Sequence, residues 1–231
     1  MNTEALRTVA ATYGTPTYIF DVREVEARIR LLRSLLPEDT GLCFAVKANP
    51  FLIPYVADLV DRLEVCSPGE YEICIQEQIA PEKIVVSGVN KTYESMKRIL
   101  SYSKGAGIYT IESEEHAKIL RTLAEKNQMP LSVLIRLSSG NQFGVDAETF
   151  LRLAKEIQES PYLTLAGVHY YAGTQKRQSK LEKELDTLTA FAKTFEEETG
   201  TVLNELEYGA GMKVSYFIND SEKDQRESEP E

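Results

Sequence analysis

The sequence predicts an α/β fold, a TIM-type (β/α)8 barrel, from three observations. Seven short apolar runs rich in β-branched residues alternate strictly with longer amphipathic runs, which is typical of parallel strands joined by helical crossovers. Each strand–helix unit spans roughly 20–35 residues, a spacing that suits either a barrel or a doubly wound open sheet. No glycine fingerprint follows the first strand, which disfavours a dinucleotide-binding sheet and favours the barrel.

The individual elements follow from residue patterns in chain order. Residues 16–21 (PTYIFD) are expected to form a strand, and residues 22–36 carry apolar residues at helical spacing up to Pro37. Seven further strands are expected at 41–47, 63–67, 84–88, 107–112, 131–137, 163–171 and 203–209. Further helices are expected at 52–62, 69–79, 92–104, 114–127, 146–159 and 178–199. With seven β units, the barrel is expected to be truncated before its eighth strand.

Composition bounds the class of protein and its surroundings. The 231 residues are 42% hydrophobic and 27% charged, which is enough apolar material for a sizeable core. The net charge of −10 repels polyphosphates, so no nucleic-acid partner is expected. No apolar run could span a bilayer, and MNTEALRTVA does not resemble a signal peptide. Three scattered cysteines fit neither a disulfide framework nor a zinc cluster, so a cytoplasmic location is expected.

The last segment, 219–231, has a composition of its own. It contains no apolar residue and has six acidic and two basic side chains. A solvated tail or an exposed loop is the expected structure.

Reactive groups in such a barrel lie at the carboxyl ends of its strands. Lys47 ends the run LCFAVK, where apolar walls would disfavour its ammonium form and lower its pKa, as a Schiff-base lysine requires. A surface lysine in a loop is the alternative reading. The other strand ends carry Cys66, Ser67, Ser87, Gly88, Glu112, Arg136, His169, Tyr171 and the turn Gly209–Gly211.

The turn Gly209-Ala210-Gly211 follows the seventh strand, where barrels usually bind phosphate. Small residues there allow several backbone N–H groups to converge on an anion. The alternative is a tight turn that only needs positive φ.

Three more residues have two readings each. His169 and Tyr171 are two positions apart and face the same side of a strand, so Tyr171 could lie flat against a planar ligand or both could fill the barrel core. Arg136 in an apolar strand needs an anionic partner, either a salt bridge or a ligand. The only other histidine, His116, is expected to be solvated, so no metal site is expected.

One motif has a complete structural explanation. Ser67-Pro68-Gly69-Glu70 matches a capping box, with Ser67 as the N-cap of a helix.

Seven stretches of the sequence carry a family resemblance. They are YGTPTYIFD (13–21), FAVKANP (44–50), EVCSPGE (64–70), PEKIVVSGVNKT (81–92), RLSSGNQFGV (136–145), GVHYYAGTQ (167–175) and EYGAGM (207–212). In this order they resemble the fold-type III pyridoxal-phosphate enzymes, most closely the diaminopimelate and ornithine decarboxylase group.

The resemblance implies roles for individual residues. Lys47 would form the Schiff base with pyridoxal 5′-phosphate and would be the catalytic residue. Tyr171 stands where the family usually places a histidine against the cofactor ring, and Glu64 where it often has an aspartate. The remaining cofactor-binding residues would be Arg136, His169, Gly209, Ala210 and Gly211, and Glu70 matches a motif glutamate.

The function implied by the resemblance is that of a pyridoxal-phosphate-dependent amino-acid decarboxylase, a carboxy-lyase of amino-acid metabolism and lysine biosynthesis. Its substrate would be diaminopimelate or a related basic amino acid, and it could form a homodimer. The alternatives are an alanine racemase-like enzyme, a non-catalytic carrier of pyridoxal phosphate, and a fragment without activity of its own.

The sequence departs from the family's pattern at its end. The family's eighth strand carries a Glu-Pro-Gly-Arg type motif, whereas the chain reads Ser228-Glu229-Pro230-Glu231. The family's C-terminal β-domain is also expected to be absent. The expected domains are an N-terminal strand (1–22) that would pack on that β-domain, the cofactor-binding barrel (23–218) and the acidic segment (219–231). Turnover by this chain alone is therefore expected to be weak.

Overall fold

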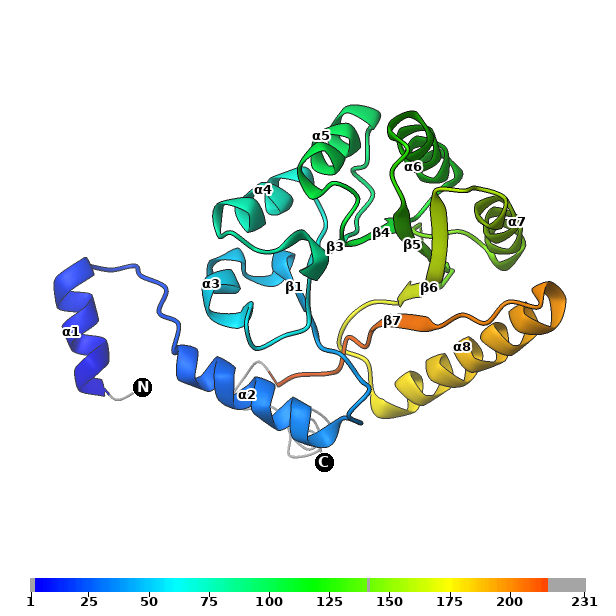
Figure 1. Cartoon of the computed structure of the whole chain (residues 1–231). Helices are drawn as coiled ribbons and strands as arrows, with labels where there is room; N and C mark the ends of the chain where they lie inside the picture. The colour runs from blue at the N-terminus through cyan, green and yellow to red at the C-terminus, as the bar shows by residue number, and fades with distance from the viewer. Residues whose placement is uncertain (1–2, 141, 216–231) are drawn as a thin grey trace.

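The sheet is a single curled layer of seven parallel strands. The structure is a computed structural model that describes residues 3–140 and 142–215. Its strands pair in sequence order: β1 (Cys43–Ala45), β2 (Arg62–Val65), β3 (Ile84–Val86), β4 (Ile108–Ile111), β5 (Leu131–Arg136), β6 (Leu163–Tyr171) and β7 (Glu205–Gly209). Figure 1 shows these strands at the centre of a ring of helices, which confirms the predicted truncated (β/α) barrel. The segment 219–231 lies outside the described residues.

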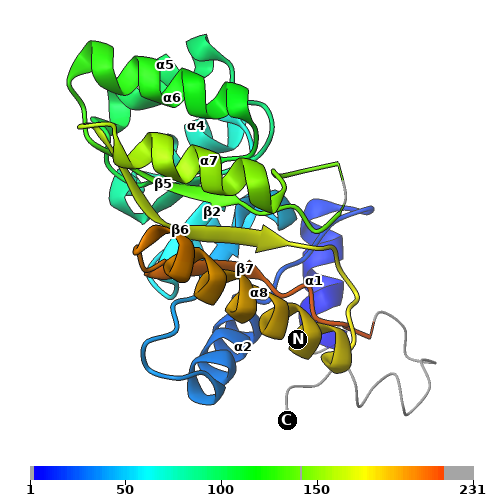
Figure 2. The same ribbon diagram turned by 90° about the vertical axis from the view of Figure 1, so that its right-hand side faces the viewer.

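Helices cover the outer face of the sheet. They are α3 (Ile53–Val56), α4 (Pro68–Gln76), α5 (Tyr93–Ser103), α6 (Glu114–Asn127), α7 (Ala147–Gln158) and α8 (Gln178–Thr199), whereas α1 (Thr3–Tyr13) and α2 (Val22–Leu35) precede the barrel strands, and Figure 1 shows α1 apart from the sheet. Short 3₁₀ turns occur at Val46–Ala48, Pro50–Leu52 and Pro81–Lys83. Figure 2 shows α7 and α8 on the outer side of the sheet beside β5, β6 and β7. Within the described part of the chain, no helix has the length and apolar content that crossing a bilayer requires.

The helix expected at 52–62 is much shorter than predicted. Its α-helical part is the single turn Ile53–Val56, preceded by the 3₁₀ turn Pro50–Leu52. Each of these turns begins with a proline at its first or second position, where the missing N–H costs nothing but a longer hydrogen-bonded helix cannot form through it.

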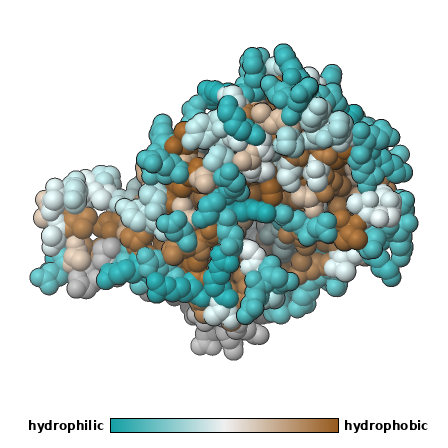
Figure 3. All heavy atoms as spheres, viewed as in Figure 1, coloured by the Kyte–Doolittle hydropathy of each residue, from teal (hydrophilic) through white to brown (hydrophobic). Residues whose placement is uncertain are grey.

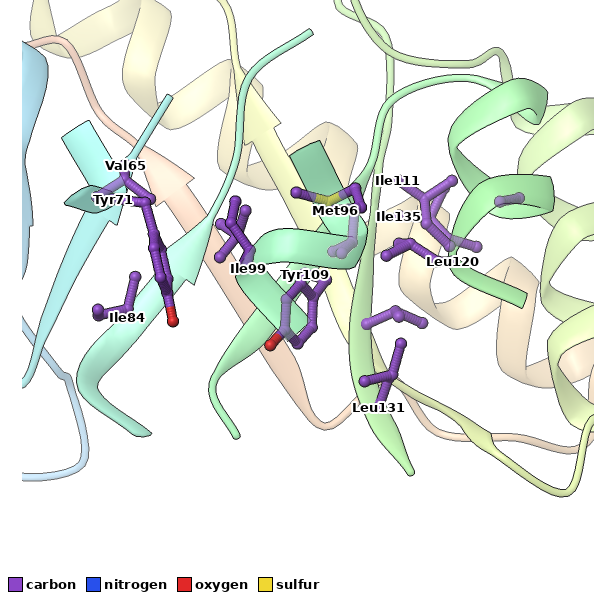
Figure 4. Packing of buried hydrophobic residues seen from close by; sticks show 14 of the residues in the cluster. Val65, Tyr71, Ile84, Met96, Ile99, Tyr109, Ile111, Leu120, Leu131 and Ile135 are labelled. Carbon is purple, nitrogen blue, oxygen red and sulfur yellow. The ribbon is translucent and has the colours of Figure 1, made fainter. Parts of the chain in front are cut away.

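The main hydrophobic core lies between the strands and the surrounding helices. Figure 4 shows Tyr71, Met96 and Leu120 packed against the strand residues Val65 and Ile135. A smaller cluster of Val85, Ile108 and Leu134 is separate from it. These three residues lie an even number of positions before Ser87, Glu112 and Arg136, so they belong to the inner face of the curled sheet.

The inner face also carries charged side chains near the amino ends of the strands. Arg62 on β2 forms an ion pair with Glu205 on β7, and its Nη2 lies 3.2 Å from Glu205 Oε2. β7 is one edge of the sheet and β2 lies next to the other edge, β1, so the two strands are not neighbours in the sheet. The pair links the second and the last strand at that end.

The N-terminal segment differs from its prediction. Residues 16–21 form no strand, because among the described residues no segment pairs with them, and a strand needs a partner for its backbone groups. The helix α1 was not predicted, and none of its residues is buried. Figure 1 shows α1 and the segment after it beside the barrel, and Figure 3 shows hydrophobic atoms on the surface there. In this N-terminal segment Tyr13 is 76% and Tyr18 93% exposed.

Candidate functional site

A cavity of about 490 Å³ opens at the carboxyl ends of the strands. Seven of the eight predicted site residues line it: Lys47, Glu64, Arg136, His169, Tyr171, Gly209 and Gly211. The eighth, Ala210, lies between the two glycines in the sequence. The residues come from segments far apart in the chain, and the parallel sheet brings them to one end of the barrel, as predicted.

Lys47 lies in the 3₁₀ turn directly after β1 rather than in the strand itself. Its side chain is exposed, so the expectation that apolar walls enclose it is wrong for this structure. The reason is local, because β1 ends at Ala45 and the chain turns before Lys47. Its Nζ lies 5.1 Å from the centroid of the Tyr171 ring.

The Tyr171 ring lies near two cationic side chains, Lys47 and Arg136. The guanidinium carbon of Arg136 is 5.9 Å from the centroid of the Tyr171 ring and 5.3 Å from that of Phe143. Both contacts are within the range of cation–π attraction. The aromatic ring is thereby held at the mouth of the cavity next to Lys47.

Arg136 is buried and forms a salt bridge, which is one of the two anionic partners that the sequence predicted for it. Its Nη1 donates a hydrogen bond to Glu112 Oε2 at 2.9 Å, and the Glu112 side chain is fully buried. Arg136 Nε is buried without a hydrogen-bond partner among the described residues. The guanidinium therefore still has donor capacity for an anion in the cavity.

A second buried cation meets the same carboxylate. Lys91 Nζ lies 3.4 Å from Glu112 Oε1 and donates a hydrogen bond to Thr110 Oγ1 at 3.1 Å. Burial lowers the pKa of Lys91 to about 8, although Glu112 opposes the shift. Sequence reasoning missed Lys91, because nothing in SGVNKT indicates that its lysine is buried.

Glu64, His169 and Glu207 form a cluster. Each contributes one side-chain nitrogen or oxygen atom, and these three atoms lie within 4.8 Å of one another. His169 Nε2 is 3.4 Å from Glu64 Oε1. Burial opposes the ionisation of Glu64, but the hydrogen bond with His169 and its charge lower the pKa of Glu64 to about 2. His169 Nδ1 and Glu207 Oε2 are buried without a hydrogen-bond partner in the described part of the chain.

Glu207 holds its proton more tightly than an ordinary carboxyl. Burial and the nearby charge of Glu64 raise the pKa of Glu207 to about 7, although His169 opposes the shift. Ionising two neighbouring buried carboxyl groups at once is unfavourable, because their negative charges repel each other. Sequence reasoning named EYGAGM but not Glu207, although its position two residues before Gly209 indicates that both face the cavity.

The two glycines of the turn are required by close contacts. A Cβ at Gly209 would lie 2.6 Å from Tyr171 Cδ2. Gly211 has φ +59, and a Cβ there would lie 2.0 Å from the carbonyl oxygen of Gly173. Gly211 thus needs positive φ, as expected if the segment were only a tight turn. Gly209 and Gly211 also line the cavity.

Two smaller expectations can be compared with the structure. His116 is buried rather than solvated, and its Nδ1 accepts a hydrogen bond from the Glu112 backbone N–H at 3.3 Å. Ser67 is the N-cap of α4 as predicted, accepting from the Glu70 N–H. Glu70 reaches back to the N–H of Cys66 instead of that of Ser67.

Comparison with protein families decides the family. Residues 22–229 match the family described as "Pyridoxal-dependent decarboxylase, pyridoxal binding domain". The chain belongs to this family. It is therefore a pyridoxal-binding domain of a carboxy-lyase family, and its cofactor is pyridoxal 5′-phosphate.

Curated relatives agree with this assignment. Diaminopimelate decarboxylase of Actinosynnema pretiosum is 31% identical over 235 residues, covering 94% of this chain and 52% of the relative. Diaminopimelate decarboxylase of Pseudomonas aeruginosa is also 31% identical, covering 92% of this chain and 55% of the relative. The chain thus spans about half the length of the curated relatives that it matches.

Solved structures show the same fold. Diaminopimelate decarboxylase from M. jannaschii in co-complex with L-lysine superposes with a TM-score of 0.82 at 21% identity, covering 93% of this chain and 55% of that one. The Helicobacter pylori enzyme complexed with L-lysine gives 0.78 at 22% identity, covering 95% and 59%.

The described residues fit the cofactor chemically. A planar ring can lie against the Tyr171 ring, and Lys47 offers an amine for the aldehyde. Of the described residues that line the cavity, three have a buried polar atom without a hydrogen-bond partner, namely Arg136 Nε, His169 Nδ1 and Glu207 Oε2. A phosphate would suit the turn of small residues at 209–211.

Proposed function

We propose that this chain is the cofactor-binding barrel of an amino-acid decarboxylase acting on meso-diaminopimelate or a related basic amino acid. The observation that carries the proposal is the position of Lys47 Nζ, 5.1 Å from the Tyr171 ring centroid at a cavity that Glu64, Arg136 and His169 also line. The similarity to diaminopimelate decarboxylases at 31% identity supports this substrate class.

In this proposal Lys47 would hold the cofactor through Nζ, and the Tyr171 ring would offer an aromatic face beside it. When bound, pyridoxal phosphate withdraws electrons from the α-carbon of an attached amino acid, which makes the loss of its carboxyl group feasible. The exposed position of Lys47 would leave the carbon bonded to Nζ open to attack by an incoming substrate amine, with Nζ as the leaving group.

The charged residues would orient an anionic group in the cavity and hold a proton beside the cofactor. Arg136, fixed by Glu112, presents its unpartnered Nε to an anionic group in the cavity. Glu64 remains ionised while Glu207, whose pKa is raised to about 7, can hold a proton at neutral pH. The cluster of Glu64, His169 and Glu207 can thus carry one proton beside the cofactor without a second buried charge.

The organisation of the whole protein is a further part of this proposal. We assign residues 23–218 to the barrel and residues 219–231 to an acidic segment, and we propose that residues 1–22 pack on a β-domain of the family's kind. The exposed Tyr13, Tyr18 and Phe20 support such a contact. A second copy of this chain could cover the same exposed side chains. Light scattering tests this alternative, because a homodimer in solution would favour it over a β-domain.

Carbon dioxide release tests the activity. The chain is loaded with pyridoxal phosphate and given meso-diaminopimelate, L-ornithine or L-lysine, with the Lys47→Ala variant as the blank. We expect release above the blank, fastest with meso-diaminopimelate. Bound cofactor with no release would favour a carrier, and conversion between stereoisomers without release would favour a racemase.

A further inference from the structure

Lys176 is a buried lysine outside the set of site residues predicted from the sequence. It lies between β6 and α8 and is only 4% exposed. Its Nζ lies 2.7 Å from Glu184 Oε2 and donates a second hydrogen bond to the backbone oxygen of Gly209 at 3.3 Å. The side chain therefore joins helix α8 to the first residue of the glycine turn.

The backbone of Lys176 contacts the same turn. Its N–H donates to the carbonyl oxygen of Gly211 at 2.9 Å, and its own carbonyl accepts from the N–H of Lys213 at 3.0 Å. A Cβ at Gly211 would lie 3.1 Å from Lys176 Cε. Side chain and backbone together hold Gly209 and Gly211 at both ends of the turn.

Glu184 and Tyr208 hold Lys176 in place. Tyr208 Oη donates to Glu184 Oε2 at 2.7 Å, and Lys176 Nζ lies 5.1 Å from the centroid of the Tyr208 ring. Burial opposes the ionisation of Glu184, but the hydrogen bonds from Lys176 and Tyr208 lower its pKa. A buried ion pair adds little to stability when an apolar pair could replace it, so a role in fixing geometry is the better explanation.

The geometry of one peptide unit links this cluster to the cavity. The Gly209 carbonyl and the Ala210 N–H belong to the same planar peptide and point in opposite directions. Because Lys176 Nζ binds that carbonyl, the Ala210 N–H points away from Lys176. Within residues 3–140 and 142–215, the N–H groups of Ala210 and Gly211 donate to no backbone acceptor outside the strand ladder.

We propose that Lys176, supported by Glu184 and Tyr208, is a positioning residue for phosphate binding, because it fixes the Gly209–Ala210 peptide with its N–H available to an anion. This inference rests on the proposed function, in which the turn binds the cofactor's phosphate. Lys176 acts through the backbone and does not touch the ligand.

The test compares pyridoxal phosphate with pyridoxal, which lacks the phosphate. Binding is followed by absorbance in the wild-type chain, in Lys176→Met and in the exposed control Lys180→Met. Lys176→Met is expected to weaken pyridoxal phosphate binding about tenfold and to leave pyridoxal binding unchanged, since one fixed donor to a charged group is lost. Lys180→Met should change neither. Equal weakening of both ligands, or of neither, overturns the inference.

Two further measurements keep the result decisive. If Lys176→Met does not fold because Glu184 is left unpaired, the double variant with Lys176→Met and Glu184→Gln replaces it, and the same selective loss is expected. A wild-type chain that binds neither ligand contradicts the proposed function instead. Inorganic phosphate then tests the inference alone: it should shift the Ala210 amide resonance in the wild type and not in the variant, and equal shifts or no wild-type shift overturn it.

Discussion

At the scale of single residues, the carboxyl groups at the cavity lie on the opposite face of the sheet from the main hydrophobic core. Glu64 and Glu207 lie on the inner faces of β2 and β7 with His169 between them in the cluster, while the hydrophobic residues of the same strands face the helices. The two carboxyls therefore have opposite pKa shifts, to about 2 for Glu64 and to about 7 for Glu207.

The raised pKa of Glu207 predicts a pH-dependent cost. In the unfolded chain this carboxyl loses its proton near its ordinary pKa of 4.5, whereas the folded protein keeps it up to about 7. The free energy of unfolding should therefore fall as pH rises from 4.5 to 7. The Gln side chain in Glu207→Gln cannot ionise. The free energy of unfolding of this variant, relative to that of the wild type, should therefore rise by on the order of 3 kcal/mol from pH 4.5 to pH 7.

Urea unfolding between pH 4.5 and 8 measures this difference. The control is Glu125→Gln on α6, where the side chain is exposed. A stability difference for Glu207→Gln that does not change with pH would show that Glu207 titrates normally.

At the scale of elements, charged pairs connect strands that are distant in the sequence. Glu112, directly after β4, joins Lys91 from the loop after β3 to Arg136 at the end of β5. Arg62 and Glu205 do the same for β2 and β7. These contacts connect separate strands and fix where the cationic groups of Lys91, Arg136 and Arg62 lie.

Removing the charge of Glu112 should be costly. Glu112→Gln leaves Lys91 and Arg136 buried without an anion, so we expect a loss of about 3–5 kcal/mol in the free energy of unfolding. Glu114→Gln removes an exposed partner of Arg152 and should cost less than about 1 kcal/mol. Similar values for both variants in denaturant unfolding would contradict the proposed network.

Breaking the bridge between β2 and β7 should have a local effect. In Arg62→Met, we expect the β7 amides Glu207 and Gly209, whose N–H groups face β6, to exchange hydrogen about tenfold faster, while Leu134 on β5 stays protected. Arg98→Met, which breaks the exposed pair with Glu72, serves as the control. Uniform acceleration over the whole sheet would show that the pair supports global stability instead.

At the scale of the whole molecule, alternation and periodicity were enough to predict the architecture. The ranges 114–127, 163–171 and 178–199 coincide with α6, β6 and α8, because these segments are long and strongly patterned. The residues 16–21 were misjudged, since strand propensity cannot show whether a partner strand exists.

The site was predictable to the extent that strand ends converge in a barrel. Lys47, Arg136 and Tyr171 follow from that rule, as does the glycine turn. The burial of Lys91 and Lys176 does not, because each depends on partners from other elements, Glu112 and Glu184, that no local pattern reveals. The exposure of Lys47 likewise results from how early β1 ends.

Borohydride reduction in the presence of pyridoxal phosphate tests the central claim most directly. The account predicts one stable adduct per chain, located by peptide mass spectrometry at Lys47 and absent from Lys47→Arg, while Lys91 and Lys176 remain unlabelled. An adduct that persists in Lys47→Arg at the wild-type level, or no adduct in the wild type, would contradict it.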